Sequence, residues 1–100
     1  MYLKKLSWNN DAKNDLMQIY NYINENSNYY SLKTINNILN LIDSLKYSPY
    51  MGRKVPEYNE NDKRELIYKS YRIIYKIESN KIVIHRIWHC SRQLTPKLIS

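Results

Sequence analysis

The chain contains few of the residues that cross-link a fold or interrupt its helices and strands. Its 100 residues include one cysteine, one glycine, three prolines and no phenylalanine. The lone Cys90 excludes a disulfide within the chain, which is typical of a reducing compartment. No apolar run is long enough to span a bilayer, and the N-terminus lacks the pattern of a signal peptide. We therefore expect a soluble cytoplasmic protein that folds as one domain over residues 1–100.

Acidic residues are also scarce. Nine Asp and Glu stand against sixteen Lys and Arg, which gives a formal net charge of +7. This charge favours an acidic partner, such as nucleic acid, an anionic surface or an acidic protein. A basic surface without a partner would have the same composition. Eleven tyrosines supply most of the aromatic groups, and tyrosine serves core edges and interfaces equally well.

The first half of the chain has the spacing of two amphipathic helices. From Ala12 to Ile23 the apolar residues recur at offsets of four, seven, eight and eleven, which places them on one helix face. The polar stretch 24–28 interrupts this pattern, and a second apolar stripe runs from Leu32 to Leu45. Pro49 and Gly52 end the second helix. Two such helices with a short joint predict an antiparallel hairpin.

The second half has the composition of β-strands. Residues 64–69, 71–78 and 81–88 are rich in β-branched and aromatic side chains, and residues 2–8 alternate loosely as a first strand would. Ser79-Asn80 and Lys69-Ser70 are suited to tight turns. The sequence predicts an α+β fold with an N-terminal strand and an antiparallel helix hairpin packed on a three- to four-stranded antiparallel sheet.

A turn at Ser79-Asn80 also predicts how the last two strands pair. Ile77 would face Ile82, Tyr75 would face Ile84, and Tyr71 would face Trp88. The helices would then cover the face formed by Tyr71, Ile73, Tyr75, Ile77, Ile82 and Ile84, with Arg86 near its rim. The opposite, basic face would carry Arg72, Ile74, Lys76, Val83, His85, Ile87 and His89.

The stretch HRIWHCSRQL at 85–94 concentrates chemically versatile side chains. His85 and His89 are four residues apart, which on a strand separates them by roughly 13 Å, too far for one metal ion. No C-x-x-C or H-E-x-x-H pattern is present, so we predict neither a metal nor a cofactor. We expect Trp88 to pack in the core and Cys90 to be a buried or half-buried small residue.

His89 and Arg92 come where the chain leaves the last strand, a common place for recognition or chemistry. Cleavage of RNA by its 2′-hydroxyl would need a base, an acid and positive charge at the phosphate. His89 could supply the base or the acid, and Arg72, Arg92 and Arg64 could supply the charge. A solvated basic edge, or one that meets an acidic partner, is the alternative interpretation.

The order and spacing of short motifs resemble those of the RelE/ParE superfamily of toxins from type II toxin–antitoxin modules. The resemblance covers nearly the whole chain. It runs through W-x-x-x-A at 8–12, I-x-x-Y-I at 19–23, I-x-x-L-x-x-x-P-x-x-G-R at 42–53, PE at 56–57, REL at 64–66, YRIIY at 71–75 and H-x-x-R-x-L at 89–94. It implies the fold predicted above and a cognate acidic antitoxin that extends around the toxin. A dimer or a toxin–antitoxin hetero-oligomer is compatible with it.

The superfamily divides by target. ParE-like members poison DNA gyrase without nuclease residues, whereas RelE-like members cut mRNA in the ribosome. The chain looks closer to ParE-like sequences, because it lacks a clear lysine pair on the central strands and a C-terminal tyrosine. The resemblance therefore implies a gyrase inhibitor that is not an enzyme. The alternative is a ribosome-dependent mRNA endonuclease with His89, Arg72 and Arg92 as catalytic residues, and a non-toxic relative is a third interpretation.

Five basic residues are candidates for contact with the target or the antitoxin. They are Arg53, Arg64, Arg86, Lys76 and His85. Structural roles are expected to compete with binding at two of them: Arg53 follows the glycine and could organise its loop, and Arg64 could pair with a nearby glutamate.

Overall fold

The computed structural model describes residues 4–91. Its elements follow the order β1 (Lys5–Trp8), α1 (Asn10–Asn24), α2 (Asn28–Ser44), β2 (Arg53–Lys54), β3 (Lys63–Tyr68), β4 (Tyr71–Ile77) and β5 (Lys81–His89). The five strands form one sheet in the order β1-β5-β4-β3-β2. Neither helix within these residues has the length and apolarity needed to cross a membrane.

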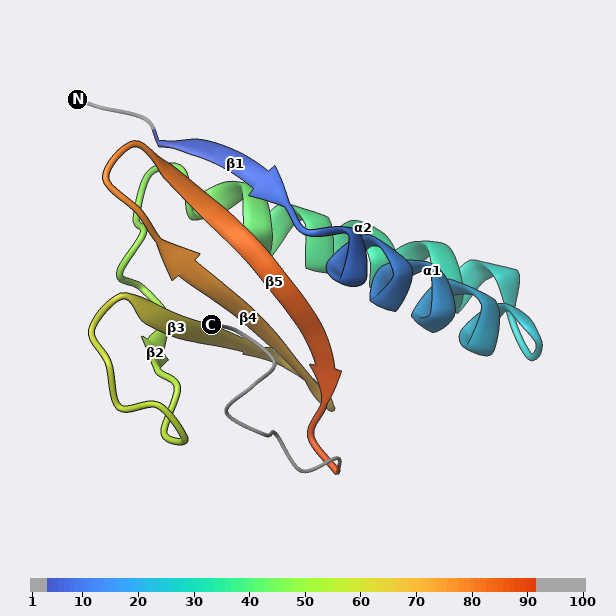
Figure 1. Cartoon of the computed structure of the whole chain (residues 1–100). Helices are drawn as coiled ribbons and strands as arrows, with labels where there is room; N and C mark the ends of the chain where they lie inside the picture. The colour runs from blue at the N-terminus through green and yellow to red at the C-terminus, as the bar shows by residue number, and fades with distance from the viewer. Residues whose placement is uncertain (1–3, 92–100) are drawn as a thin grey trace.

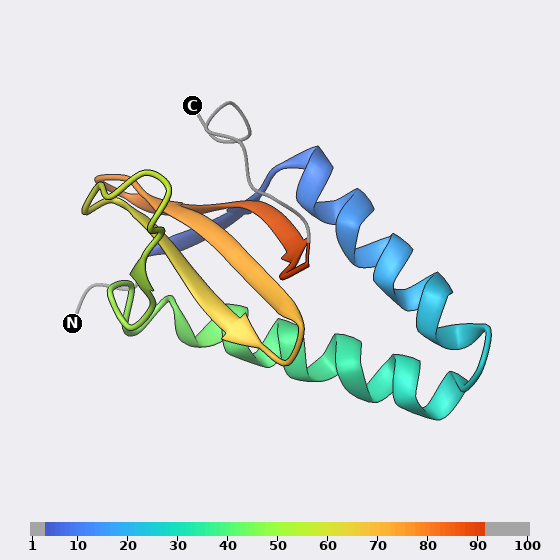
Figure 2. The ribbon, with the colours of Figure 1, turned by 90° about the horizontal axis from the view of Figure 1, so that it is seen from below.

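The two helices form the predicted antiparallel hairpin, and their connecting loop projects beyond the sheet (Figures 1 and 2). Ser27 caps the N-terminus of α2, because its hydroxyl accepts a hydrogen bond from the backbone N–H of Tyr30 at 3.2 Å. The buried Ser31 donates its hydroxyl to the carbonyl of Tyr20 at 2.7 Å, which ties α2 to α1. The short joint and the Ser31–Tyr20 hydrogen bond hold the helices side by side.

The main core lies between the hairpin and one face of the sheet. Its buried members from the helices are Ala12, Ile19, Ile38 and Ile42, and those from the strands are Leu66, Ile73, Tyr75, Ile77, Ile82, Ile84 and Ile87, with Leu45 at the end of α2. A smaller cluster of Val55, Ile74 and Trp88, with Tyr58 beside it, covers the opposite face. Trp88 is buried as predicted, whereas Cys90 is exposed and the prediction of a buried cysteine is wrong.

The fold class is confirmed, and the sheet is larger than expected and mixed. β2 is only two residues long, too short to be found from an alternating pattern. β1 pairs parallel with β5, from Lys5 opposite Lys81 to Trp8 opposite Ile84. The remaining neighbours pair antiparallel.

The predicted register of β4 and β5 is correct only near the turn. Ile77 pairs with Ile82 and Tyr75 with Ile84, as predicted. The register then shifts at Ile74/Tyr75, so that Tyr71 lies opposite His89 and not opposite Trp88. One extra residue in a strand moves every later side chain to the other face.

Because of this bulge, the side chains at the end of β5 lie on other faces of the sheet than predicted. Ile87 belongs to the core under the helices, and His89 lies on the same side, next to Tyr71. Arg72 lies opposite Trp88 on the other face. The prediction that Arg72, Ile87 and His89 share one basic face is therefore wrong.

Candidate functional site

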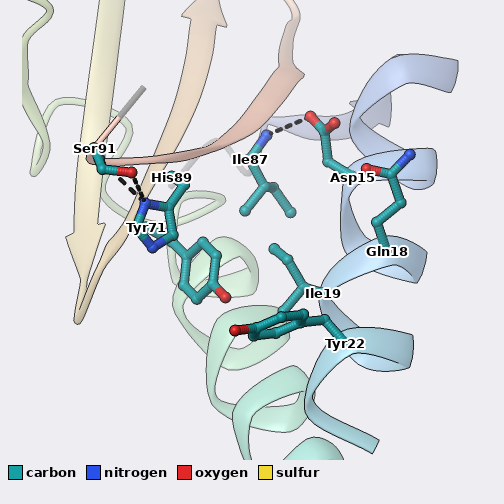
Figure 3. A pocket seen from close by; sticks show the side chains of 8 residues that line it. All are labelled: Asp15, Gln18, Ile19, Tyr22, Tyr71, Ile87, His89 and Ser91. Carbon is teal, nitrogen blue, oxygen red and sulfur yellow. Dashed lines mark hydrogen bonds between the residues drawn. The ribbon is translucent and has the colours of Figure 1, made fainter. Parts of the chain in front are cut away.

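A pocket of about 330 Å³ opens between α1 and the ends of β4 and β5, on the helix side of the sheet. Figure 3 shows the side chains that line it. They are Asp15, Gln18, Ile19, Tyr22, Tyr71, Ile87, His89 and Ser91. Isoleucines form an apolar floor, and tyrosines, the histidine and the serine surround it with polar groups.

His89 stands at the rim of this pocket with a defined orientation. Its Nδ1 accepts a hydrogen bond from the backbone N–H of Ser91 at 3.1 Å and lies 2.7 Å from the Ser91 hydroxyl. A nitrogen that accepts from an N–H carries no proton, so the neutral imidazole carries its proton on Nε2. The ring packs edge-on against Tyr71, with 5.4 Å between the ring centroids. His89 therefore offers an N–H donor in its neutral form.

Asp15 fixes the wall that α1 contributes. Its Oδ2 accepts from Nε of Arg86 at 2.8 Å and from the backbone N–H of Ile87 at 3.0 Å, and its Oδ1 accepts from Nη2 of Arg86 at 2.9 Å. β1 pairs with β5 only as far as Ile84. Beyond that point the Asp15 carboxylate, in place of a backbone carbonyl of a neighbouring strand, accepts the hydrogen bond from the Ile87 N–H. The hydrogen bonds that Arg86 donates to the Asp15 carboxylate raise the pKa of Arg86.

Asp15 was not among the residues predicted from the sequence. A signal was present, because it lies three residues after Ala12 and four before Ile19, on the apolar face of the helix. An acidic residue on a buried helix face requires a partner. Its partner is Arg86 of β5, 71 residues away in the sequence, so the packing of α1 beside β5 and not the local sequence brings the two side chains together.

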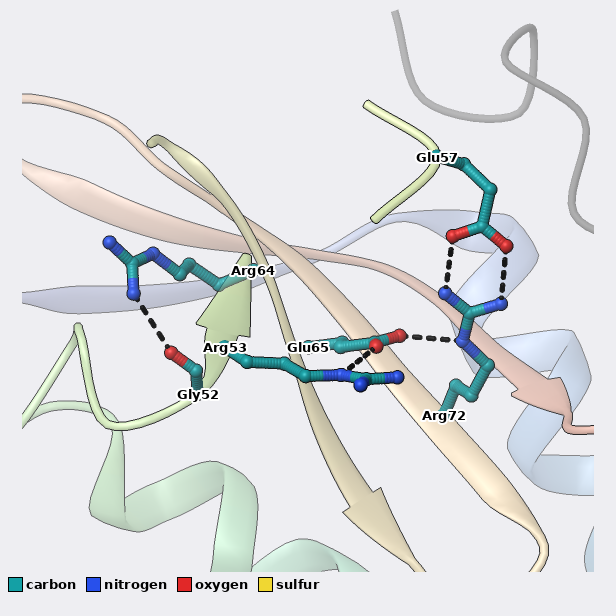
Figure 4. A network of polar contacts seen from close by, with 6 residues as sticks. All are labelled: Gly52, Arg53, Glu57, Arg64, Glu65 and Arg72. Carbon is teal, nitrogen blue, oxygen red and sulfur yellow. Dashed lines mark hydrogen bonds and ion pairs between the residues drawn. The ribbon is translucent and has the colours of Figure 1, made fainter. Parts of the chain in front are cut away.

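A second polar cluster lies on the opposite face of the sheet (Figure 4). Glu65 on β3 has a fully buried side chain and binds Nε of Arg72 at 2.5 Å and Nε of Arg53 at 2.6 Å. Glu57 accepts two hydrogen bonds from the remaining nitrogens of Arg72, at 2.7 and 2.9 Å. The Glu57 carboxylate raises the pKa of Arg72, and Arg72 in turn lowers the pKa of Glu57. The two carboxylates of Glu57 and Glu65 and the two guanidinium groups of Arg53 and Arg72 thus balance one another.

The loop before β2 is held against this cluster by the chain's one glycine. The N–H of Gly52 donates to the hydroxyl of Tyr75 at 3.1 Å, and that hydroxyl donates to the carbonyl of Pro49 at 2.7 Å. Nη1 of Arg64 donates to the carbonyl of Gly52 at 3.0 Å. A Cβ at position 52 would lie 2.5 Å from the carbonyl oxygen of Glu65, so only glycine allows this approach.

The residues predicted to act together in catalysis are separated. Arg72 is bound to two carboxylates on one face of the sheet, and His89 lines the pocket on the other. Arg92 lies outside the described residues. Within residues 4–91, no group of three or more histidine, cysteine, aspartate or glutamate side chains is placed to hold a metal ion.

The five residues predicted to bind a partner occupy three separate places. Arg53 pairs with Glu65, and Arg64 binds the carbonyl of Gly52, so both have structural contacts, but the two predicted structural roles are exchanged. Arg86 pairs with an aspartate and lies over the Trp88 ring at 4.8 Å. Lys76 and His85 lie near each other, and burial, followed by the charge of Lys76, lowers the pKa of His85.

Comparisons with known proteins agree with this architecture. The family model described as "ParE toxin of type II toxin-antitoxin system, parDE" matches residues 6–94. A solved chain from the "Chromosomal ParDE TA system from P. aeruginosa" is similar in fold, with a TM-score of 0.73 at 22% identity, over 89% of this chain and 98% of that one. A chain from "The structure of YoeB dimer from Staphylococcus aureus" has a TM-score of 0.60 at 20% identity, over 86% and 95% of the two chains.

No curated protein sequence matches the chain. The two structural similarities show the fold, and the family model, which spans β1 to the end of the sheet, shows the family. The resemblance predicted from the motifs is confirmed, including the closer relation to ParE-like members. The chain belongs to the ParE toxin family of type II toxin–antitoxin systems, within the RelE/ParE superfamily.

Proposed function

We propose that this toxin inhibits growth by binding DNA gyrase and not by chemistry of its own. The observation that carries this proposal is the environment of Arg72. Its guanidinium is bound by Glu57 and Glu65, while His89 lies on the opposite face of the sheet. Acid–base cleavage of RNA requires its proton-transfer groups and its phosphate-binding charge within reach of one substrate. Arg72 and His89 do not meet that requirement.

A cognate acidic antitoxin belongs to this proposal. The net charge of +7 suits an acidic partner, and the similar P. aeruginosa chain comes from a ParDE toxin–antitoxin system. An extended acidic segment could cover a large part of a basic surface of this size and fold on it. Binding should therefore weaken as the salt concentration rises.

Two assays on the same purified toxin test the target. In a supercoiling reaction with gyrase and relaxed plasmid, we expect loss of supercoiled product and accumulation of broken DNA. In cell-free translation followed by primer extension, we expect intact mRNA. Full supercoiling by gyrase, with a toxin that circular dichroism shows to be folded, would contradict the proposal.

The exposed imidazole of His89 favours one second candidate, a ribosome-dependent mRNA endonuclease. The ring lies beside the Tyr71 phenol and the Ser91 hydroxyl, which are groups able to transfer or relay protons. In that case cuts would appear within codons in the primer-extension assay, and His89→Ala would abolish them. Uncut mRNA with both the wild type and the variant would exclude this candidate.

A further inference from the structure

The pocket beside α1 contains polar groups that the fold does not use. Within residues 4–91, the hydroxyls of Tyr22 and Tyr71 and the carboxamide of Gln18 form no hydrogen bond to another residue. Figure 3 shows the two tyrosine hydroxyls pointing toward each other at the mouth of the pocket. Nε2 of His89 adds an N–H donor to the same rim. These groups are therefore available to a ligand.

Asp15, the acidic residue of the pocket lining, does not repel an anionic ligand, because its charge is already paired. Both oxygens of Asp15 are occupied, by the two nitrogens of Arg86 and by the backbone N–H of Ile87. The Asp15–Arg86 pair has no net charge, and the chain as a whole carries +7. An incoming carboxylate would thus meet O–H and N–H donors in a positive overall field.

The floor of the pocket favours a ligand that also has an apolar part. Ile19 and Ile87 are buried beneath the polar rim, 7% and 4% exposed, and they offer apolar contact to the stem of a ligand. A volume of about 330 Å³ is at the small end of ligand pockets and is large enough for a side chain. The size and the chemistry suit a carboxylate on a short aliphatic stem.

We propose that this pocket is a docking site for a glutamate side chain of an acidic protein partner. The aliphatic stem of the glutamate packs on Ile19 and Ile87, and its carboxylate accepts hydrogen bonds from the hydroxyls of Tyr22 and Tyr71 and from Nε2 of His89. The net charge of +7 favours an acidic protein segment as the source of this carboxylate. Binding at this pocket is tested with neither gyrase nor the ribosome, so its outcome does not depend on which of them is the target.

The test is an NMR titration of the full chain at physiological salt. The probes are a blocked acidic peptide, acetyl-Leu-Glu-Glu-Leu-amide, and its glutamine counterpart, which differ only in charge. We expect the acidic peptide to shift the methyl signals of Ile19 and Ile87 and the ring signals of His89. Tyr22→Phe/Tyr71→Phe should weaken its binding roughly threefold to tenfold, because hydrogen bonds to a charged group are lost while both rings remain.

The matched control is Tyr29→Phe/Tyr30→Phe, which removes two exposed hydroxyls from α2, outside the pocket. This control should bind the acidic peptide as the wild type does. Equal binding of both peptides or equal binding by the pocket variant would overturn the proposal. Shifts confined to the paired Lys63 and Lys76 of β3 and β4, which lie outside the pocket, would also overturn it. Free glutarate that binds as tightly as the peptide would overturn the assignment to a protein partner.

Discussion

Replacing Arg72 with methionine should destabilise the fold, because it removes the more buried partner of the Glu65 carboxylate. Glu65 is fully buried, and Arg72 is the more buried of its two partners, with 10% of its side chain exposed against 61% for Arg53. Removing one partner of a buried ion pair costs about 3–5 kcal/mol, because the other charge stays in the interior. Arg53 remains in the variant, so we expect a loss near the lower end, about 3 kcal/mol.

The matched variant is Arg53→Met, which removes the exposed partner and should cost about 1 kcal/mol or less. Urea unfolding followed by circular dichroism and tryptophan fluorescence would give both values. For a domain of this length, 3 kcal/mol corresponds to a fall in Tm of about 12 °C or more. The double variant Glu65→Leu/Arg72→Met should recover most of the loss, because it leaves no buried charge. Equal losses for the two single variants, or no recovery in the double variant, would refute this reasoning.

Three further changes probe other contacts. Asp15→Ala should cost about 2–4 kcal/mol and speed hydrogen exchange at the Ile87 amide, which loses its acceptor; unchanged exchange would show that the carboxylate does not protect this edge. Gly52→Ala should lower the urea midpoint by the equivalent of about 1–3 kcal/mol, since its Cβ would collide with the Glu65 carbonyl. Glu57→Gln should flatten the acid limb of a stability–pH curve. The folded pKa of Glu57 lies below its ordinary value near 4.5, so its contribution is complete above that pH and lost as the pH falls through the folded value. An unchanged acid limb would contradict that assignment.

The local sequence determines most of the secondary structure of this protein. The apolar period of residues 12–23 and 32–45 predicts both helices, and the composition of residues 64–88 predicts β3, β4 and β5. The turn at Ser79-Asn80 sets the pairing of Ile77 with Ile82, because a two-residue turn leaves only one register close to it. The motif order indicated the RelE/ParE fold, which depends on these same local patterns.

The tertiary structure decides which side chains meet. One extra residue at the β5 bulge moves Ile87 and His89 to the helix side and separates His89 from Arg72, and no local pattern marks where such a residue is accommodated. Arg86, the partner of Asp15, lies 71 residues away in the sequence, so this ion pair depends on the packing of β5 beside α1 and not on spacing. The sequence alone therefore determines that His89 stands at the end of a strand. The bulge in β5 places it on the helix side of the sheet, and the packing of α1 beside β5 forms the pocket onto which it opens.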